Sequence, residues 1–201
     1  MYNTEIINTA IEIFFDTVKR FNKKLYNNLD SGLSEIEIKN FESTVNFKFP
    51  PEVFSLYRLK NGFKIESKLN LHQSLLFDNG LFLSVEQATS EYNALYKNIP
   101  ELKFKLPLFD SGGGDFLLLD CDPNSPNYRK ILIWSPPLEI VEPEVIYRSL
   151  ADLCLTNTRC LTTDVYRYDD NGDLQFDFQK LKAAAILANG RLEYWNKRFD
   201  V

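Results

Sequence analysis

Apolar residues near the start of the chain recur at steps of three and four, which is the spacing of one face of an α-helix. They predict a helix over residues 4–28, with basic residues near its end that complement the negative end of the helix dipole. The residues of the predicted buried face are Ile7, Ile11, Phe14, Phe15 and Val18. We expect this N-terminal helix, within residues 1–29, to pack on a single domain formed by residues 30–201.

A second helix is predicted from the signals at its ends. After the break at Asp30-Ser31-Gly32, Ser34 and Glu37 have the spacing of a capping box, in which each side chain binds a backbone N–H group of the first helical turn. Asn46 is predicted to stop this helix in a left-handed conformation. The apolar stripe between these ends consists of Ile38, Phe41 and Val45.

A third, short helix is predicted to follow Phe49-Pro50-Pro51, because a proline at a helix start needs no N–H donor. Asn61-Gly62 is predicted to end it, with glycine supplying the positive φ of a C-terminal cap. Between these ends, the residues at helical spacing are Val53, Leu56, Tyr57 and Lys60.

The rest of the chain alternates short apolar runs with turn residues, a pattern typical of strands joined by hairpins. The predicted strands cover residues 69–77, 81–83, 106–109, 116–119, 131–134 and 165–168, with turns at 78–80, 111–114 and 169–173. The predicted helices run from the capping box of Ser84 and Gln87 to Lys97, over 145–155 and over 178–187. Neighbouring strands joined by turns, with helices grouped around them, favour an α+β fold with a mostly antiparallel or mixed sheet.

Charge and targeting signals narrow the class of protein. The 201 residues include 23 Lys and Arg against 28 Asp and Glu, a formal net charge of −5, which argues against a nucleic-acid-binding protein with a basic stripe. No segment has the pattern of a signal peptide or of a membrane span, so we expect a cytoplasmic protein with no membrane partner. In that compartment Cys121, Cys154 and Cys160 are expected to be reduced thiols.

Residues suited to nucleophilic or metal chemistry are scarce. His72 is the only histidine, and a Ser-His or Cys-His pair would have to use it. The cysteines lack the spacing of zinc ligands. We therefore predict no catalytic residue, no metal and no cofactor. The alternative is an enzyme that uses a carboxylate pair, such as Asp110 with Asp115 or Glu139 with Glu142.

Two further motifs are interpreted as turns. Gly112 to Gly114 precedes a strand and Asp115, whereas a phosphate-binding loop opens a helix and continues with lysine. In Asp169 to Asp173 the glycine stands at the fourth position, and the twelfth position is Lys180, so a calcium-binding loop is not predicted.

Acidic residues gather in the middle of the chain, close in sequence to two aromatic residues. Such a surface suits a basic protein partner, because charge speeds the encounter and rigid aromatic side chains anchor the contact. The alternative is a set of separate solvated turns. The residues that we expect to bind a protein partner are Asp110, Asp115, Asp122, Tyr128, Trp134, Glu139, Glu142 and Glu144.

The segment between residues 32 and 62 resembles a known family. Gly32-Leu33-Ser34-Glu35, Phe41-Glu42, Phe49-Pro50 and Asn61-Gly62 are similar in type and spacing to the pattern of the SUKH superfamily, which includes a fungal cell-wall-assembly regulator and many bacterial immunity proteins. The resemblance extends over about residues 30–155. Three positions depart from the pattern, at Asn46, Phe49 and Phe63, and none of them removes a chemical group.

The resemblance implies an α+β scaffold without known catalysis. It also implies that a bacterial member neutralises a toxin domain, often a nuclease, made by a neighbouring gene. The function expected is therefore that of a non-enzymatic immunity protein that binds a cognate toxin. The alternative is an intracellular regulatory or scaffolding adaptor of the cell-wall-assembly-regulator type, with several partners of moderate affinity.

Overall fold

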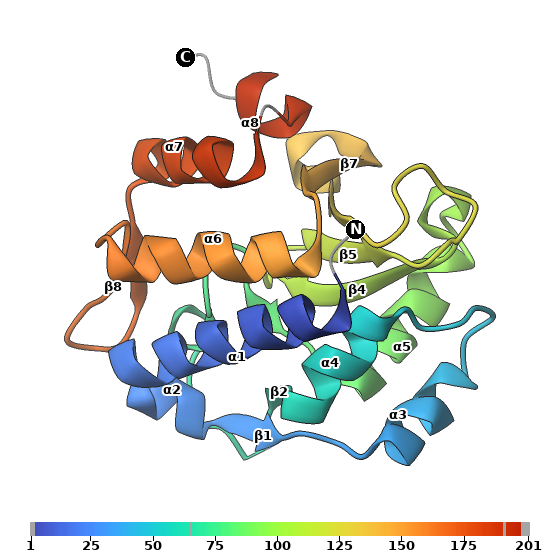
Figure 1. Cartoon of the computed structure of the whole chain (residues 1–201), viewed down its shortest axis with the longest axis horizontal. Coiled ribbons are helices and arrows are strands. Elements are labelled where there is room, and N and C mark those ends of the chain that lie inside the picture. Colours follow the sequence, from blue (N-terminus) through green and yellow to red (C-terminus); the bar gives the residue numbers. More distant parts are fainter. Residues whose placement is uncertain (1–2, 65, 191, 198–201) are drawn as a thin grey trace.

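A five-stranded antiparallel sheet forms the centre of the computed structural model, which describes residues 3–64, 66–190 and 192–197 (Figure 1). Its strands are β3 (Leu81–Phe82), β4 (Lys105–Asp110), β5 (Phe116–Asp120), β6 (Ile131–Ser135) and β7 (Ile140–Tyr147), in that spatial order. Every residue of β5 and β6 is buried, which explains why these strands are continuous apolar runs rather than alternating ones. The predicted α+β fold with an antiparallel sheet is confirmed.

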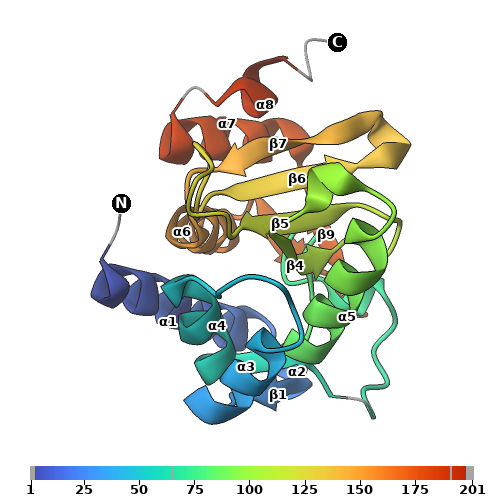
Figure 2. The same cartoon turned by 90° about the vertical axis from the view of Figure 1, so that its right-hand side faces the viewer.

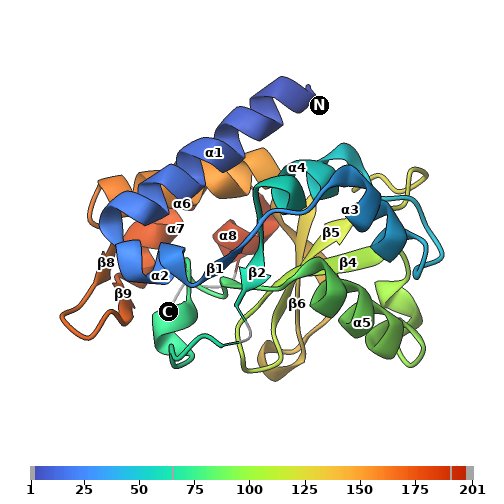
Figure 3. The ribbon, with the colours of Figure 1, turned by 90° about the horizontal axis from the view of Figure 1, so that it is seen from below.

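Helices and two small hairpins surround this sheet. The helices are α1 (Thr4–Phe21), α2 (Lys23–Asn27), α3 (Glu35–Glu42), α4 (Pro51–Leu59), α5 (Val85–Tyr96), α6 (Leu150–Thr162), α7 (Phe178–Asn189) and α8 (Glu193–Lys197), with short 3₁₀ turns η1 (His72–Ser74), η2 (Pro100–Leu102) and η3 (Pro136–Leu138). The two-stranded sheets pair β1 (Leu29–Ser31) with β2 (Lys60–Phe63), and β8 (Tyr166–Tyr168) with β9 (Leu174–Phe176). α1 lies along α6, α5 packs on β4, and α8 packs beside β7 (Figures 2 and 3).

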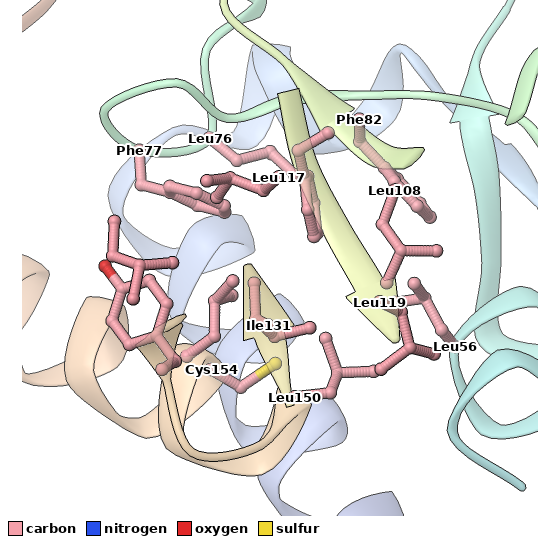
Figure 4. Close-up of a cluster of buried hydrophobic side chains, with 14 of the residues drawn as sticks. Leu56, Leu76, Phe77, Phe82, Leu108, Leu117, Leu119, Ile131, Leu150 and Cys154 are labelled. Carbon is pink, nitrogen blue, oxygen red and sulfur yellow. The ribbon is translucent and has the colours of Figure 1, made fainter. Parts of the chain in front are cut away.

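One buried cluster joins these parts, as Figure 4 shows. Side chains from α4, from the segment before β3, from the central strands and from α6 meet at its centre. They include Leu56, Leu76, Phe77, Phe82, Leu108, Leu117, Leu119, Ile131, Leu150 and Cys154. Each of these side chains removes apolar surface from water at about 25 cal/mol per Å², so the helices and the sheet are stabilised together.

The helix ends that the sequence predicted by capping are confirmed for α3 and α5. Ser34 and Ser84 each accept a hydrogen bond from the third residue of their helix, and the side chains of Glu37 and Gln87 accept from the backbone N–H of the two serines. The prediction for residues 4–28 was partly wrong, because Asn22 divides the helix. Its N–H donates to the Val18 carbonyl and its side chain caps α2, so one residue both ends α1 and begins α2.

Two predicted helix stops were wrong. α3 ends at Glu42 without a left-handed residue, and Asn46 instead accepts a hydrogen bond of 2.7 Å from the Tyr92 hydroxyl. Asn61-Gly62 lies within β2, because α4 has already ended at Leu59. The Asn61 side chain accepts from the Val85 N–H at 2.9 Å, which ties β2 to the start of α5.

Two segments adopt a different secondary structure from the predicted one. Residues 69–77 form a loop with the η1 turn rather than a strand, and His72 lies exposed in that turn. The predicted helix over 145–155 is divided between β7 and α6, since Ser149 caps α6 and the chain before it is extended. The turn at 169–173 is confirmed, with the Gly172 N–H bound to the Asp169 carbonyl at 2.9 Å.

Candidate functional site

The two hairpin tips at one end of the main sheet bring most of the expected partner-binding residues together. Asp110 pairs with Phe116, and Phe116 pairs with Trp134, so the β4–β5 turn and the β6–β7 turn emerge from the same end. Figure 2 shows the β6–β7 turn at the far end of the sheet from the β5–β6 loop. We call the region formed by Asp110, Asp115, Glu139, Glu142 and Glu144 the acidic end.

Hydrogen bonds within the β4–β5 turn fix the first two carboxylates of the acidic end. Asp110 accepts from the Gly112 N–H at 2.7 Å, and Asp115 accepts from the Ser111 hydroxyl at 2.8 Å and from the Ser135 hydroxyl. The Ser111 N–H closes the hairpin on the Asp115 carbonyl at 2.9 Å. The predicted turn is confirmed, and its carboxylates are held in place before any partner arrives.

The β6–β7 turn combines exposed acidic and exposed apolar side chains. Glu139 and Glu142 are exposed, and Leu138 and Val141 are 54% and 64% exposed, which is high for aliphatic residues. Trp134 differs from expectation, because it is only 7% exposed. Its indole N–H donates to the Val141 carbonyl at 3.2 Å, so it supports the hairpin from beneath rather than presenting its ring to solvent.

The remaining two expected residues lie at the opposite end of the sheet. Asp122 and Tyr128 belong to the loop between β5 and β6, where Asp122 accepts from the Asn124 N–H at 2.9 Å. A strand of five residues is about 13 Å long, so this loop is well separated from the acidic end. The structure therefore divides the expected set between two places.

A further carboxylate, which the sequence did not indicate, adjoins the acidic end. Burial, and then the neighbouring negative charge of Asp115, raises the pKa of Asp78 to about 6 from its ordinary value of 3.8. Asp78 stands in the turn before β3, and that strand pairs with β4 next to Asp110. The acidic end thus has beside it a carboxylate, Asp78, that takes up a proton just below neutral pH.

This raised pKa predicts the sign of a pH effect on stability. The folded chain binds the Asp78 proton more tightly than the unfolded chain, so the stability due to this group is fully present below about pH 4 and is lost as the pH rises through about 6. Asp78→Asn should therefore raise the free energy of unfolding by about 1–2 kcal/mol at neutral pH and by almost nothing near pH 4. Urea unfolding at the two pH values measures this change in the free energy of unfolding. An equal change at both pH values would contradict the raised pKa of Asp78.

At the other end of the sheet, the β5–β6 loop forms one wall of a cleft of about 530 Å³. The first turns of α4 and α6 form its other walls. The residues that line it are Glu52, Pro126, Tyr128, Arg129, Lys130, Arg148, Ser149 and Asp152. We call this region the loop cleft.

A buried ion pair stands in the wall of the loop cleft. The Arg129 Nε lies 2.6 Å from the Glu52 Oε1, and the two side chains are 13% and 2% exposed. Arg129 has a φ of 67°, a left-handed conformation that is uncommon for a residue with a side chain. Its N–H is held by the Asp120 carbonyl at 2.8 Å, so the loop itself imposes this backbone and directs the guanidinium at Glu52.

Sequence reasoning missed these cleft residues. Glu52 is in the first turn of α4, where a carboxylate favours the positive end of the helix dipole, and this was the one local signal that marked it. Arg148 and Asp152 form an i,i+4 pair at the start of α6, with 3.4 Å between Nε and Oδ2. The four-residue spacing of this pair is visible in the sequence, but only the fold places it beside Glu52 and Arg129.

Among the described residues, no group of three or more His, Cys, Asp or Glu side chains is arranged to hold a metal ion. In the same part of the chain, every helix is too short or too polar to cross a membrane.

Comparison with known proteins identifies the family. No curated protein sequence matches this chain. A family model, described as the SMI1 / KNR4 family (SUKH-1), matches residues 32–155, which is more than half of the chain and contains both α3 and the main sheet. This chain therefore belongs to the SMI1 / KNR4 family (SUKH-1).

Proposed function

We propose that this chain is a non-enzymatic, cytoplasmic immunity protein that binds a cognate toxin domain and blocks it. The family it belongs to and the acidic end support this proposal, and the acidic end carries it. Asp110 and Asp115 are fixed by hydrogen bonds in the β4–β5 turn, and Glu139 and Glu142 are exposed at the β6–β7 turn beside two exposed aliphatic side chains. Fixed charges around an apolar centre lower the ordering cost of binding a basic protein surface.

The chemistry of the partner follows from this arrangement. A nuclease domain is basic around the groove that holds its substrate phosphates, and rows of carboxylates fit the same cations. Leu138 and Val141 would fill the centre of the contact, with Glu139 and Glu142 beside them. The chain would then act by occupying the groove, without any bond being made or broken.

Charge reversal at the β6–β7 turn tests the proposed face. Glu139→Lys combined with Glu142→Lys should weaken binding of the toxin by about tenfold to a hundredfold, mainly through slower association, and raising the salt concentration should reduce the difference. The partner for this measurement is the product of the neighbouring gene, co-purified with this chain. Surface plasmon resonance at two salt concentrations gives the rates.

A matched control is available on α1. Glu12→Lys combined with Asp16→Lys makes the same change in net charge on exposed residues away from the acidic end and should leave the affinity within about twofold of the original. Equal weakening by both double variants would reject the acidic end as the binding face. Failure of the unmodified chain to protect cells that express the neighbouring gene product would reject the immunity function. Recovery of several partners and no toxin would favour the regulatory adaptor.

A further inference from the structure

Three cationic side chains converge on the loop cleft. Arg129 and Lys130 come from the β5–β6 loop, and Arg148 comes from the corner between β7 and α6. Among the described residues that line the same cleft, the carboxylates are those of Glu52 and Asp152. In a chain whose net charge is −5, this local excess of positive charge runs against the overall balance.

Both carboxylates already bind neighbouring side chains, so some of the cationic N–H donors in the cleft have no acceptor in the part of the chain that the structure describes. Glu52 takes the Nε edge of Arg129 at 2.6 Å, and Asp152 accepts from the Ser149 hydroxyl at 3.1 Å and from Arg148 at 3.4 Å. A guanidinium has five N–H donors in a planar fork, so the Nη groups of Arg129 keep their capacity. Within the described part of the chain, these Nη groups have no hydrogen-bond acceptor, and the Lys130 Nζ has one, the Asn127 side chain at 3.0 Å.

The start of α6 adds a partial positive charge to the cleft. Ser149, which caps this 13-residue helix, is part of the cleft wall. The N–H groups in the first turn of a helix have no acceptor within the helix, and together with the helix dipole they favour an anion. One of these N–H groups, that of Asp152, is not available to an anion, because it donates to the Ser149 hydroxyl at 3.0 Å.

The ion pair in the cleft wall is incompletely satisfied. Glu52 is 2% exposed, and its Oε2 has no hydrogen-bond partner among the described residues. Leaving a buried charged oxygen unpaired costs about 1–3 kcal/mol or more.

We propose that the loop cleft binds a small phosphate-bearing molecule. Arg148 donates from Nη2 to the Ala188 carbonyl at 2.8 Å, and its other Nη group remains for the cleft. The donors left on Arg129, Lys130 and Arg148, together with a helix start, suit a tetrahedral anion with several acceptor oxygens better than a planar carboxylate, which a single arginine fork satisfies. Tyr128 and Pro126 form an apolar wall for the body of the ligand. A volume of about 530 Å³ lies in the range of small-molecule sites, and the phosphate is either inorganic phosphate or the monoester group of a nucleotide. This site is independent of the toxin-binding face.

Titration of the isolated chain with inorganic phosphate, adenosine monophosphate and adenosine tests the proposal, because no partner protein is needed. Isothermal titration calorimetry at low salt should detect at least one of the two phosphate probes and should not detect adenosine. Tighter binding of adenosine monophosphate than of phosphate assigns the site to a nucleotide, and equal binding assigns it to free phosphate. Binding of neither phosphate probe at millimolar concentration, or equal binding of adenosine, overturns the proposal.

Variants separate a built site from general attraction of anions. Lys130→Gln and Arg148→Gln should each weaken phosphate binding about tenfold, while Lys97→Gln and Arg20→Gln, which remove exposed cations elsewhere, should leave it unchanged. Circular dichroism checks that each variant is folded. Equal weakening by the cleft variants and by the control variants would show non-specific attraction and reject the site.

Discussion

Arg129→Met is expected to lower the free energy of unfolding by about 3–5 kcal/mol, because it leaves the Glu52 carboxylate buried without its cation. Methionine keeps much of the aliphatic volume of arginine, so the loss reports the missing charge more than a cavity. The left-handed backbone at position 129 costs the same free energy before and after the substitution, so it does not contribute to the difference. Urea unfolding at neutral pH, followed by tryptophan fluorescence, measures the change.

Two further variants make this expectation specific. Adding Glu52→Gln to Arg129→Met removes the unpaired charge and should restore at least half of the lost stability, since a neutral amide costs less to bury than a lone carboxylate. Lys48→Met breaks a pair of similar length, 2.8 Å, whose lysine is 90% exposed, and should cost about 0.5 kcal/mol or less. A loss below about 1 kcal/mol for Arg129→Met would mean that water solvates the pair.

The parts of the fold that the sequence predicted correctly depend on neighbours in the chain. A capping box needs only residues three apart, so Ser34 with Glu37 and Ser84 with Gln87 identified the starts of α3 and α5. The apolar runs of β4 and β5 on either side of the 111–114 turn likewise predicted a pair of neighbouring strands, and these two strands do pair. Local hydrogen bonds and burial act together in these segments, and so the pattern and the structure agree.

The spacing of apolar residues gave a wrong prediction where the end of a strand and the start of a helix follow each other directly. Ile146, Leu150 and Leu153 have helical spacing, but Ile146 belongs to β7 and the others to α6. The register of β7 against β6 shifts twice, so its residues do not alternate cleanly between buried and exposed. Irregular pairing of this kind is decided by the neighbouring strand, and no window of the sequence contains that information.

The two candidate sites show the same difference between residues that are close in sequence and residues that only the fold brings together. The acidic end was predicted because its hairpin tips are close in sequence, as Asp110 with Asp115 and Glu139 with Glu142 illustrate. The ion pair of the loop cleft joins residues 77 positions apart, Glu52 and Arg129, and only the fold brings them together. Trp134 was close in sequence to the acidic residues, yet it points into the core because β6 is covered on both faces.

Gly62 shows how a correct local inference can have a different structural reason. Its φ is +72°, the positive value that the sequence predicted, but it lies in β2 and not at the end of α4. There β2 passes so close to the start of α5 that a Cβ on Gly62 would lie 2.4 Å from the backbone nitrogen of Ser84 and 2.8 Å from its Cα. Backbone atoms cannot turn away as a flexible side chain can.

Gly62→Ala is therefore expected to lower the free energy of unfolding by about 2–5 kcal/mol. A left-handed alanine costs about 1–2 kcal/mol, and the overlap with Ser84 adds about 1–3 kcal/mol of displaced backbone. The displacement should also disturb the 2.9 Å bond from the Val85 N–H to the Asn61 side chain. Urea unfolding measures the loss, and slower-exchanging amides at the start of α5 should lose protection in hydrogen exchange.

Gly172→Ala separates the cost of the left-handed backbone from the cost of steric overlap. Gly172 also has a positive φ, +87°, but a Cβ there would have no atom within 4 Å, so this variant should cost only the backbone term of about 1–2 kcal/mol. The difference between the two variants then measures the close approach of β2 to α5. Equal losses would mean that the segment around Ser84 moves aside at little cost, and the Asn61-Gly62 pair would then act through its backbone conformation alone.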